Sequence, residues 1–321
     1  MFKNTYFILN LRPDMRDDKE GRRCYLRIKS IYKRKILTNK GGKGSIPKQN
    51  KTMKGDMIQE YRHKPKKALG QHFLTDHSIV RRIVSEAGIT EGTHVLEVGP
   101  GHGILTKALL DVGAIVTAVE IDRDLIEPLQ KRFGDSIRLI KKDILRLNWD
   151  DLDMPEGSAI VANLPFQITS PFIFKAIAYR HLFPNVTVMI QKEVAERIIS
   201  GPGTKAYGIL SLKAQYYYNT SYLFTVPPYV FSPAPKVESA VIKLEPRLDA
   251  PVLDNPQQFW NLVEISFRNR RKMLRVNLKS ILPKEKVDIL TETGPIELTR
   301  RGETLNEEEF LLLYSAVAAL F

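Results

Sequence analysis

The segment Asn163-Leu164-Pro165-Phe166 carries the residue types best suited to chemistry in this chain of 321 residues. It follows a short apolar run, 159–162, which predicts a buried strand. Within four residues it offers an amide side chain, a backbone carbonyl, a proline without an N–H group and an aromatic ring. Two acceptors and a stacking face suit a flat base with an exocyclic amino group. We predict methylation of an adenine amine with these four residues as the catalytic set; an ordinary strand-to-loop turn is the alternative.

The N6 nitrogen of adenine is a weak nucleophile because its lone pair is delocalised into the ring. If the Asn163 side-chain oxygen and the Leu164 carbonyl accept hydrogen bonds from both of its N–H groups, a pyramidal nitrogen with a localised lone pair is favoured. Stacking on Phe166 would add roughly 1–3 kcal/mol of binding energy. With an already activated methyl donor, the reaction requires no general base.

A glycine-rich turn between an expected strand and helix, residues 95–106, predicts a second binding element. The spacing is Gly99-x-Gly101-x-Gly103, and Ile104 breaks the G-x-G-x-x-G pattern of dinucleotide-binding proteins. Glycines allow close approach of the backbone to a ligand and leave N–H groups free at a helix N-terminus. We therefore expect Gly99 and Gly101 to contact a cofactor; a purely structural turn is the alternative.

Polar side chains end the strands that follow this turn. Glu120 lies 19 residues after Gly101, where a carboxylate can accept both hydroxyls of a ribose. Asp143 is placed to accept a hydrogen bond from an adenine amine, and Asn163 ends the next strand. Taken singly, each acid could equally be a helix cap or a loop carboxylate. Because the carboxyl ends of parallel strands meet at one edge, the set predicts an adenosine-bearing cofactor without a second nucleotide, with S-adenosylmethionine as the best candidate.

Expected strands and helices alternate over most of the chain, which predicts an α/β fold with a mostly parallel, doubly wound sheet. The expected strands are 95–99, 115–121, 137–142, 159–162 and 186–191. The expected helices between them are 77–88, 103–112, 123–133 and 170–180. Two further β-rich runs, 212–226 and 238–244, predict an antiparallel pair at the sheet edge, with the tyrosines of 216–218 filling strand faces. The helices 256–268, 271–281, 284–291 and 306–320 then predict a small all-α domain.

The net charge of +13 resides almost entirely in the N-terminal part. Residues 1–66 hold 19 basic and 6 acidic residues, whereas 67–321 hold 30 of each. One local cluster in that neutral body predicts an RNA-binding patch, with a solvated helix face as the alternative. The cluster consists of Arg268, Arg270, Arg271, Lys272 and Arg275, and Lys64, Lys66 and Lys67 are expected to extend it.

The rest of the composition excludes several classes of protein. The single Cys24 excludes an internal disulfide framework and fits a reducing cytoplasm. The six histidines show no metal-ligand spacing, so we expect no metal site. No run of 18 or more apolar residues could cross a membrane. We expect a cytoplasmic monomer.

Residues 1–56 are basic, lack sustained periodicity and include a linker-like stretch, 40–51. Three interpretations stay open. The true start could be Met53 or Met57, the segment could be a disordered RNA-binding arm, or it could be an organellar targeting peptide. Four acidic residues between 14 and 20 count against the last, because such peptides are poor in acid.

The chain resembles the ribosomal RNA adenine N6,N6-dimethyltransferases, the small-subunit dimethyladenosine transferases, from about Lys64 to Leu320. Six segments carry the resemblance: Leu69-Gly-Gln-His-Phe-Leu74, Glu97-Val-Gly-Pro-Gly101, Asn163-Leu-Pro-Phe166, Ser232-Pro-Ala-Pro-Lys-Val-Glu-Ser239, Phe267-Arg-Asn-Arg-Arg-Lys-Met-Leu274 and Arg301-Gly-Glu-Thr-Leu305. It implies a Rossmann-like class I methyltransferase domain, here 57–246, and a helical RNA-binding C-terminal domain, here 247–321.

The resemblance also implies S-adenosylmethionine as donor and two adjacent adenines in the 3′-terminal hairpin of 16S rRNA as target, within the 30S ribosomal subunit or its precursor. The implied cofactor contacts are His72, Leu74, Gly99, Glu120, Asp143 and Asn163. Position 72 is commonly Asn in the family and position 166 commonly Tyr. Because Phe166 keeps the stacking face and lacks the hydroxyl, a hydroxyl-dependent step is not expected.

Two other functions compete with this interpretation. The related 23S rRNA methyltransferases that confer macrolide resistance are disfavoured by the segments 232–237 and 267–272. A ribosome-assembly factor that binds RNA without methylating it is disfavoured by the intact glycine turn, Glu120 and Asn163.

Overall fold

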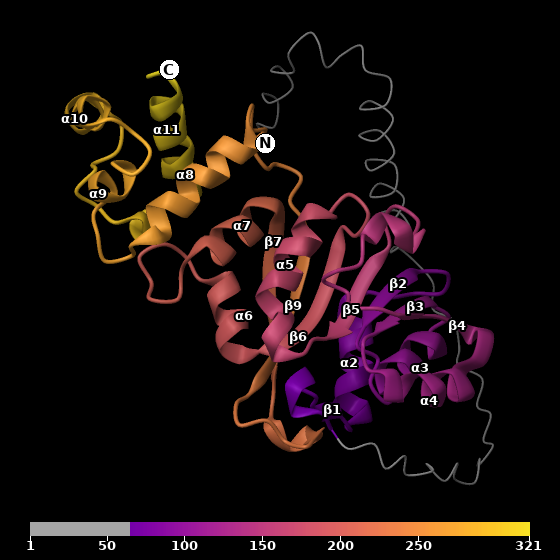
Figure 1. The fold of residues 1–321 in the computed structure, drawn as a ribbon. Coiled ribbons are helices and arrows are strands. Elements are labelled where there is room, and N and C mark those ends of the chain that lie inside the picture. The colour runs from indigo at the N-terminus through magenta and orange to yellow at the C-terminus, as the bar shows by residue number, and fades with distance from the viewer. Residues whose placement is uncertain (1–64) are drawn as a thin grey trace, which may run out of the picture. The chain divides into compact units, whose positions relative to one another are not determined.

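The computed structural model describes residues 65–321 (Figure 1). The predicted extension 1–56, with its alternative starts, and Lys64 lie outside the described residues. A mixed seven-stranded sheet has the strand order β4-β3-β2-β5-β6-β9-β7, and β1 and β8 form a separate two-stranded sheet. The strands are β1 (Phe73–Leu74), β2 (His94–Val98), β3 (Ile115–Glu120), β4 (Ile137–Lys141), β5 (Ala159–Asn163), β6 (Asn185–Gln191), β7 (Tyr218–Val226), β8 (Phe231–Ser232) and β9 (Ser239–Pro246).

The sheet is parallel from β4 to β6, and β9 and β7 are antiparallel additions at one edge. This confirms the predicted α/β class with an antiparallel edge. Since β2 to β5 are parallel, their carboxyl ends lie along one side of the sheet, and the polar residues that end them come together there. The α-helices are α2 (His77–Ala87), α3 (Ile104–Asp111), α4 (Arg123–Phe133), α5 (Thr169–Ala178), α6 (Lys192–Ile199), α7 (Ile209–Tyr217), α8 (Pro256–Arg268), α9 (Leu274–Leu278), α10 (Lys284–Thr293) and α11 (Glu307–Ala318).

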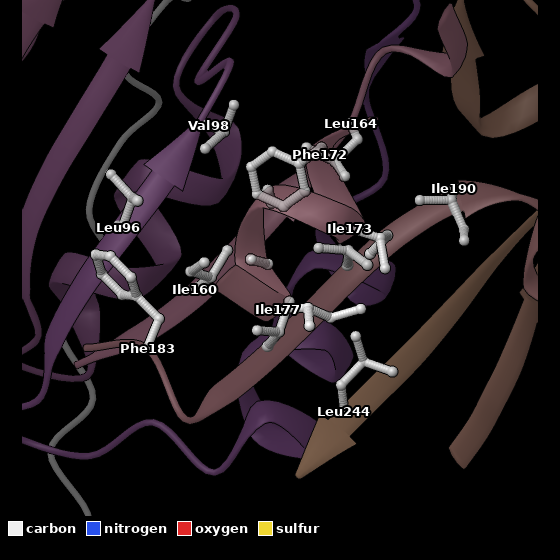
Figure 2. Close-up of a cluster of buried hydrophobic side chains, with 14 of the residues drawn as sticks. Leu96, Val98, Ile160, Leu164, Phe172, Ile173, Ile177, Phe183, Ile190 and Leu244 are labelled. Atoms are coloured by element: carbon white, nitrogen blue, oxygen red, sulfur yellow. The ribbon is translucent and has the colours of Figure 1, made fainter. Parts of the chain in front are cut away.

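Each face of the sheet has its own hydrophobic core, because successive side chains of a buried strand point to opposite faces. In β2, Val95 belongs to the core under α2, α3 and α4, whereas Leu96 belongs to the core under α5, α6 and α7. Figure 2 shows part of the second core, in which Ile160 of β5 lies with Phe172 and Ile173 of α5. The central strands β2, β5 and β6 are buried on both faces and are therefore mostly apolar in sequence.

A third core lies among the C-terminal helices α8 to α11 and includes Leu212 and Tyr216 of α7. Helix α7, which precedes residue 246, thus shares a core with helices α8 to α11, which follow it. The domain boundary expected at residue 246 stays a prediction. In the described residues after Pro246 no strand forms, as expected. None of the helices described in 65–321 is long and apolar enough to span a membrane.

Two predicted elements differ from the structure, and one helix is additional. Residues 212–217 of the expected strand 212–226 belong to α7, so Tyr216 and Tyr217 lie on a helix rather than on a strand face. Tyr216 is buried against Trp260 and its hydroxyl donates to the Pro251 carbonyl, so tertiary packing overrides its β propensity. The expected helix 271–281 shortens to α9, because 269–273 form a turn. Helix α6 was not predicted at all.

Candidate functional site

A cavity of about 280 Å³ lies at the carboxyl ends of β2, β3 and β5. Its wall includes all ten residues predicted for catalysis and cofactor binding, which come from segments far apart in the sequence. These residues are His72, Leu74, Gly99, Gly101, Glu120, Asp143, Asn163, Leu164, Pro165 and Phe166. The structure therefore brings the predicted set together, and what each residue binds is taken up below as a proposal.

The glycine turn follows β2 and leads into α3. Gly99, Gly101 and Gly103 all have positive φ, at 67°, 58° and 78°, a region that side chains with a Cβ atom rarely adopt. A Cβ atom at Gly101 would lie 2.9 Å from the Phe73 ring, and one at Gly103 would lie 2.4 Å from the Phe133 ring. No side chain caps the N-terminus of α3, so its first N–H groups are available to a ligand.

Glu120 ends β3 and is buried at the cavity wall. Its two carboxylate oxygens accept the Asp122 N–H at 2.8 Å and the Gly101 N–H at 3.4 Å. Burial raises the pKa of Glu120, and these N–H donors partly offset the rise. The glycine turn and the Glu120 carboxylate are thus held to one another at the cavity wall.

Asp122, two residues after Glu120, connects Glu120 to the segment that precedes β1. It accepts hydrogen bonds from Lys66 Nζ at 2.5 Å and from Gln71 Nε2 at 2.6 Å. Lys66 also pairs with Asp124. Two acidic partners thus engage the Lys66 ammonium group, and the RNA contact expected for it stays a prediction.

Asp143 lies two residues beyond β4, at the cavity wall. One carboxylate oxygen accepts the Leu145 N–H at 2.9 Å, and the other lies 3.5 Å from Arg146 Nε. These contacts are those of a loop carboxylate, which was the alternative to ligand binding for Asp143. The half-exposed carboxylate can serve both, because each of its oxygens accepts more than one hydrogen bond.

Asn163 is the last residue of β5, and its side chain has a defined orientation. Its Nδ2 donates to the His72 carbonyl at 3.4 Å, so Oδ1 is the amide atom left to accept from a ligand. The next N–H group, that of Leu164, donates to the Met189 carbonyl at 3.0 Å, and Pro165 has none. The segment therefore presents acceptors, which is the polarity that an exocyclic amine requires.

Glu97, the fourth residue of β2, was not among the predicted site residues. Its side chain is only 1% exposed, and neither carboxyl oxygen has a hydrogen-bond partner among residues 65–321. The buried Thr106 hydroxyl lacks one too. Burial raises the pKa of Glu97 from an ordinary 4.5 to about 8, and the nearby Thr106 and its backbone only partly counter this. An acid inside the apolar run Val95-Leu-Glu-Val was the signal that could have revealed it.

These features fit S-adenosylmethionine. A buried carboxyl group without a partner costs free energy unless a donor or cation reaches it, and Glu97 lines the cavity. In the glycine turn, a Cβ atom at Gly99 would have no atom closer than 4.0 Å, so a ligand can approach the backbone there, whereas at Gly101 and Gly103 the Phe73 and Phe133 rings occupy that space. Glu120 places a buried carboxylate at the same wall. Among the described residues no group of three or more His, Cys, Asp or Glu side chains is placed to hold a metal ion.

The predicted RNA-binding residues lie outside this cavity, on the α8–α9 turn and the helix ends beside it. Four of them are exposed and make no ion pair within residues 65–321: Arg268, Arg271, Lys272 and Arg275. Side chains of this kind are available to phosphate groups.

Arg270 differs from its basic neighbours. Its guanidinium donates to Glu303 Oε2 at 2.9 Å and to the backbone carbonyls of Lys205 and Tyr207 at 3.0 and 2.8 Å. The segment 200–208 therefore connects to the C-terminal helices through this side chain. The geometry gives Arg270 a structural role, and the RNA contact expected for it stays a prediction.

Comparison with known proteins shows the family. The family model "Ribosomal RNA adenine dimethylase" matches residues 62–318. The chain is 42% identical over 261 residues to ribosomal RNA small subunit methyltransferase A of Clostridium botulinum strain Okra, covering 79% of this chain and 94% of that protein. The protein of the same name from Prosthecochloris aestuarii is 39% identical over 264 residues, covering 81% and 98%.

Two solved structures resemble this one over most of the described residues. A dimethyladenosine transferase from Plasmodium falciparum has a TM-score of 0.64 and 29% identity, covering 75% of this chain and 96% of that one. The 23S rRNA methyltransferase ErmE has a TM-score of 0.58 and 25% identity, covering 77% and 99%. The cavity, its acceptor segment and these matches agree. The chain belongs to the ribosomal RNA adenine dimethylase family and is an S-adenosylmethionine-dependent enzyme that dimethylates adenine in ribosomal RNA.

Proposed function

We propose that the protein methylates the N6 atoms of two adjacent adenines in the 3′-terminal hairpin of 16S rRNA, within the 30S subunit or its precursor. The names of its relatives, small subunit methyltransferase A, support the choice of subunit. The observation that carries the chemistry is the Asn163 amide, which the His72 carbonyl holds with its oxygen available to a base amine. The proposal places a monomer in the cytoplasm, where small subunits are assembled.

At the reacting centre, Asn163 Oδ1 and the Leu164 carbonyl accept the two N–H groups of adenine N6. Acceptors placed before the reaction stabilise the pyramidal nitrogen of the transition state without reorganisation. Pro165 sets the turn with φ −55° and ψ 133°, and Phe166 offers its ring to the base. When bound, S-adenosylmethionine supplies a methyl group activated by the sulfonium charge. Alignment of the amine by this chain then supplies much of the remaining rate.

The cofactor is proposed to bind to four groups of the cavity. Glu120 accepts the ribose hydroxyls, Asp143 accepts from the adenine amine, and the glycine turn at Gly99 and Gly101 lies against the methionine moiety. Glu97 is proposed to face the cationic end of that moiety, because a buried acid without a partner is stabilised by a nearby positive charge.

The rRNA is proposed to bind along the exposed cations Arg268, Arg271, Lys272 and Arg275. Arg271 and Lys272 lie on the turn between α8 and α9, with Arg268 and Arg275 at the helix ends beside it, and Arg270 connects this turn to the segment 200–208. Phosphate contacts of this kind position the RNA and carry no sequence information themselves. Recognition of the target base is then left to the cavity.

Methylation of 23S rRNA is the second candidate, and the similarity to ErmE favours it. The discriminating experiment transfers labelled methyl groups to unmodified 30S particles and, in parallel, to 50S particles, followed by mapping of the modified base. Label at two adjacent 16S adenines is expected. Label on 23S rRNA alone, or none on either particle, would overturn the proposal.

The same assay tests the acceptor role. Asn163→Ala should reduce transfer by at least a hundredfold while 30S binding is retained, since removal of one preorganised transition-state contact costs roughly 10²–10³ in rate. Asn219→Ala, which changes an exposed amide on β7, is the matched control. Substantial turnover by Asn163→Ala would refute the role of the amide.

A further inference from the structure

The ammonium group of Lys175, on α5, is hydrogen-bonded to the loop that carries Asp143. Its Nζ donates to the Leu145 carbonyl at 2.8 Å and to the Leu147 carbonyl at 2.5 Å. Asp143 and Leu145 line the cavity, whereas Lys175 is not among the residues of its wall. Lys175 therefore contacts the loop that forms this wall without reaching the cavity itself.

Side chains, rather than a regular helix or strand, satisfy carbonyls of this loop. The Ile144 carbonyl accepts Nε1 of Trp149 at 3.0 Å. The carbonyls of Leu145 and Leu147 have the ammonium group of Lys175 as their donor. Because a partly buried carbonyl that loses its donor costs free energy, removal of this ammonium group should let the loop turn towards water.

A short chain of hydrogen bonds leads from Lys175 to the Asp143 carboxylate. Leu145 accepts from Lys175 through its carbonyl and donates through its N–H to one oxygen of Asp143 at 2.9 Å. The two charges also act on one another directly. Burial lowers the pKa of Lys175, and the Asp143 carboxylate partly counters this by favouring the ammonium form.

Helix α5 is a fixed support for this ammonium group. Phe172, Ile173 and Ile177 of α5 are buried in the core between the helix and the sheet (Figure 2). The helix begins directly after the segment 163–168, which lines the cavity at the proposed position of the target base. One helix thus connects that segment to the loop of Asp143.

We propose that Lys175 is a positioning residue for the cofactor, which holds Leu145, and through it the Asp143 carboxylate, where that carboxylate accepts the amine of the cofactor's adenine. This rests on the proposed function, in which Asp143 accepts from that amine. Lys175 touches neither the cofactor nor the reacting atoms. Its contribution is selectivity for an adenine ring at this end of the cavity.

A general support of the fold is the competing interpretation of Lys175. Such a role predicts an equal loss of affinity for every ligand of the cavity, whereas a positioning role predicts a loss confined to ligands that carry the amine. S-adenosylhomocysteine carries it. S-inosylhomocysteine has a carbonyl oxygen in its place and cannot donate to Asp143 there, so a site built around this bond should reject it.

Calorimetry of the full chain with the two compounds measures the preference, which is the ratio of their dissociation constants. We expect the wild type to prefer S-adenosylhomocysteine at least about tenfold, since a hydrogen bond to a charged group is lost in the other compound. Lys175→Met removes the donor and keeps a flexible apolar side chain. It should reduce the preference at least about threefold, while the Kd for S-inosylhomocysteine changes less than about twofold.

The matched control is Lys213→Met, on α7. Nζ of Lys213 lies 5.0 Å from the centroid of the Trp260 ring, as Nζ of Lys175 lies 5.6 Å from that of Trp149. Burial lowers the pKa of Lys213 as well, but this residue is not part of the cavity wall. Lys213→Met should therefore keep the wild-type preference.

Asp143→Ala tests whether Lys175 acts through Asp143. It should reduce the preference at least as much as Lys175→Met, and the double variant should show little further reduction, because the two changes remove the same contact. An equal loss of affinity for both compounds in Lys175→Met, an unchanged preference, or additive effects in the double variant would overturn the inference.

Thermal unfolding shows first that each variant is folded. If Lys175→Met is not, Lys175→Gln, whose uncharged side chain ends one atom short of Nζ, replaces it under the same criteria. Methyl transfer to 30S particles is measured separately, and a wild type that prefers S-adenosylhomocysteine but transfers no methyl group defeats the proposed target alone. A wild type without this preference defeats the proposed Asp143 contact and the role of Lys175 with it.

Discussion

Replacing Glu97 with Gln should change how the stability of the cofactor-free protein depends on pH. The native pKa of about 8 lies far above the ordinary 4.5, because the carboxyl group is buried without a partner. At pH values below 4.5, the Glu97 carboxyl group is protonated in both the folded and the unfolded protein, so its ionisation does not reduce the free energy of unfolding. As pH rises towards 8, the unfolded chain releases this proton first, so the free energy of unfolding falls.

The size of the effect follows from the shift. About 1.4 kcal/mol for each pKa unit, over the interval from 4.5 to about 8, gives an upper bound on the order of 5 kcal/mol for the loss of stability. That is comparable to the whole free energy of unfolding of many domains, 5–15 kcal/mol. Glu97→Gln keeps the shape and cannot ionise, so this part of the loss should disappear.

Urea unfolding at pH 5, 6, 7 and 8 without cofactor measures the effect. The difference in the free energy of unfolding between Glu97→Gln and wild type should grow by several kcal/mol in favour of the variant across this range. A residual slope in the variant is expected from Glu120, whose pKa is also raised by burial. Glu127→Gln, at an exposed position of α4, is the control. Parallel curves for wild type and Glu97→Gln would refute the reasoning.

Three further changes test other parts of the molecule. Gly103→Ala should destabilise the protein by about 1–3 kcal/mol in urea unfolding, since φ is 78° and the new Cβ atom would meet the Phe133 ring; wild-type stability would contradict this. Joint alanine substitution of Arg271 and Lys272 should reduce the salt dependence of 30S binding by the amount expected for about two lost phosphate contacts, with the melting temperature unchanged. Arg270→Ala should instead lower the melting temperature, because it removes the bonds to Glu303, Lys205 and Tyr207. The reverse pattern would reject this division of roles. Deletion of 1–56 should leave methyl transfer intact if that segment precedes the true start, and a large loss of 30S affinity would identify it as an RNA-binding arm instead.

The grouping of the predicted site residues around one cavity could be foreseen because of a property of parallel sheets. Glu120 and Asn163 each end a strand, and strands that run in the same direction end at the same edge. Short segments of sequence therefore predict that these side chains lie close together in the fold, without knowledge of any contact between them. The glycine turn is equally local, since the strand, the turn and the helix follow one another directly.

The errors lie where tertiary packing decides. The run 212–217 contains residues that suit both a strand and a helix, and it becomes part of α7 because Leu212 and Tyr216 complete the core of the C-terminal helices. Arg270 reads as one cation among five. Only the fold brings the carbonyls of Lys205 and Tyr207, more than sixty residues earlier, within reach of its guanidinium.

The contact between His72 and Phe166 lay beyond sequence reasoning for the same reason. The bond from His72 to Pro233 spans 161 residues and depends on the pairing of β1 with β8. Yet the sequence already showed that both positions differ from the residue that is common in the family, with His72 in place of Asn and Phe166 in place of Tyr. The structure places both departures in a single ring-to-ring contact. Phe166 keeps the aromatic face that Tyr would offer and lacks only its hydroxyl, and the His72 ring still donates a hydrogen bond, to the Pro233 carbonyl, so neither departure removes the means of contact that the common residue has.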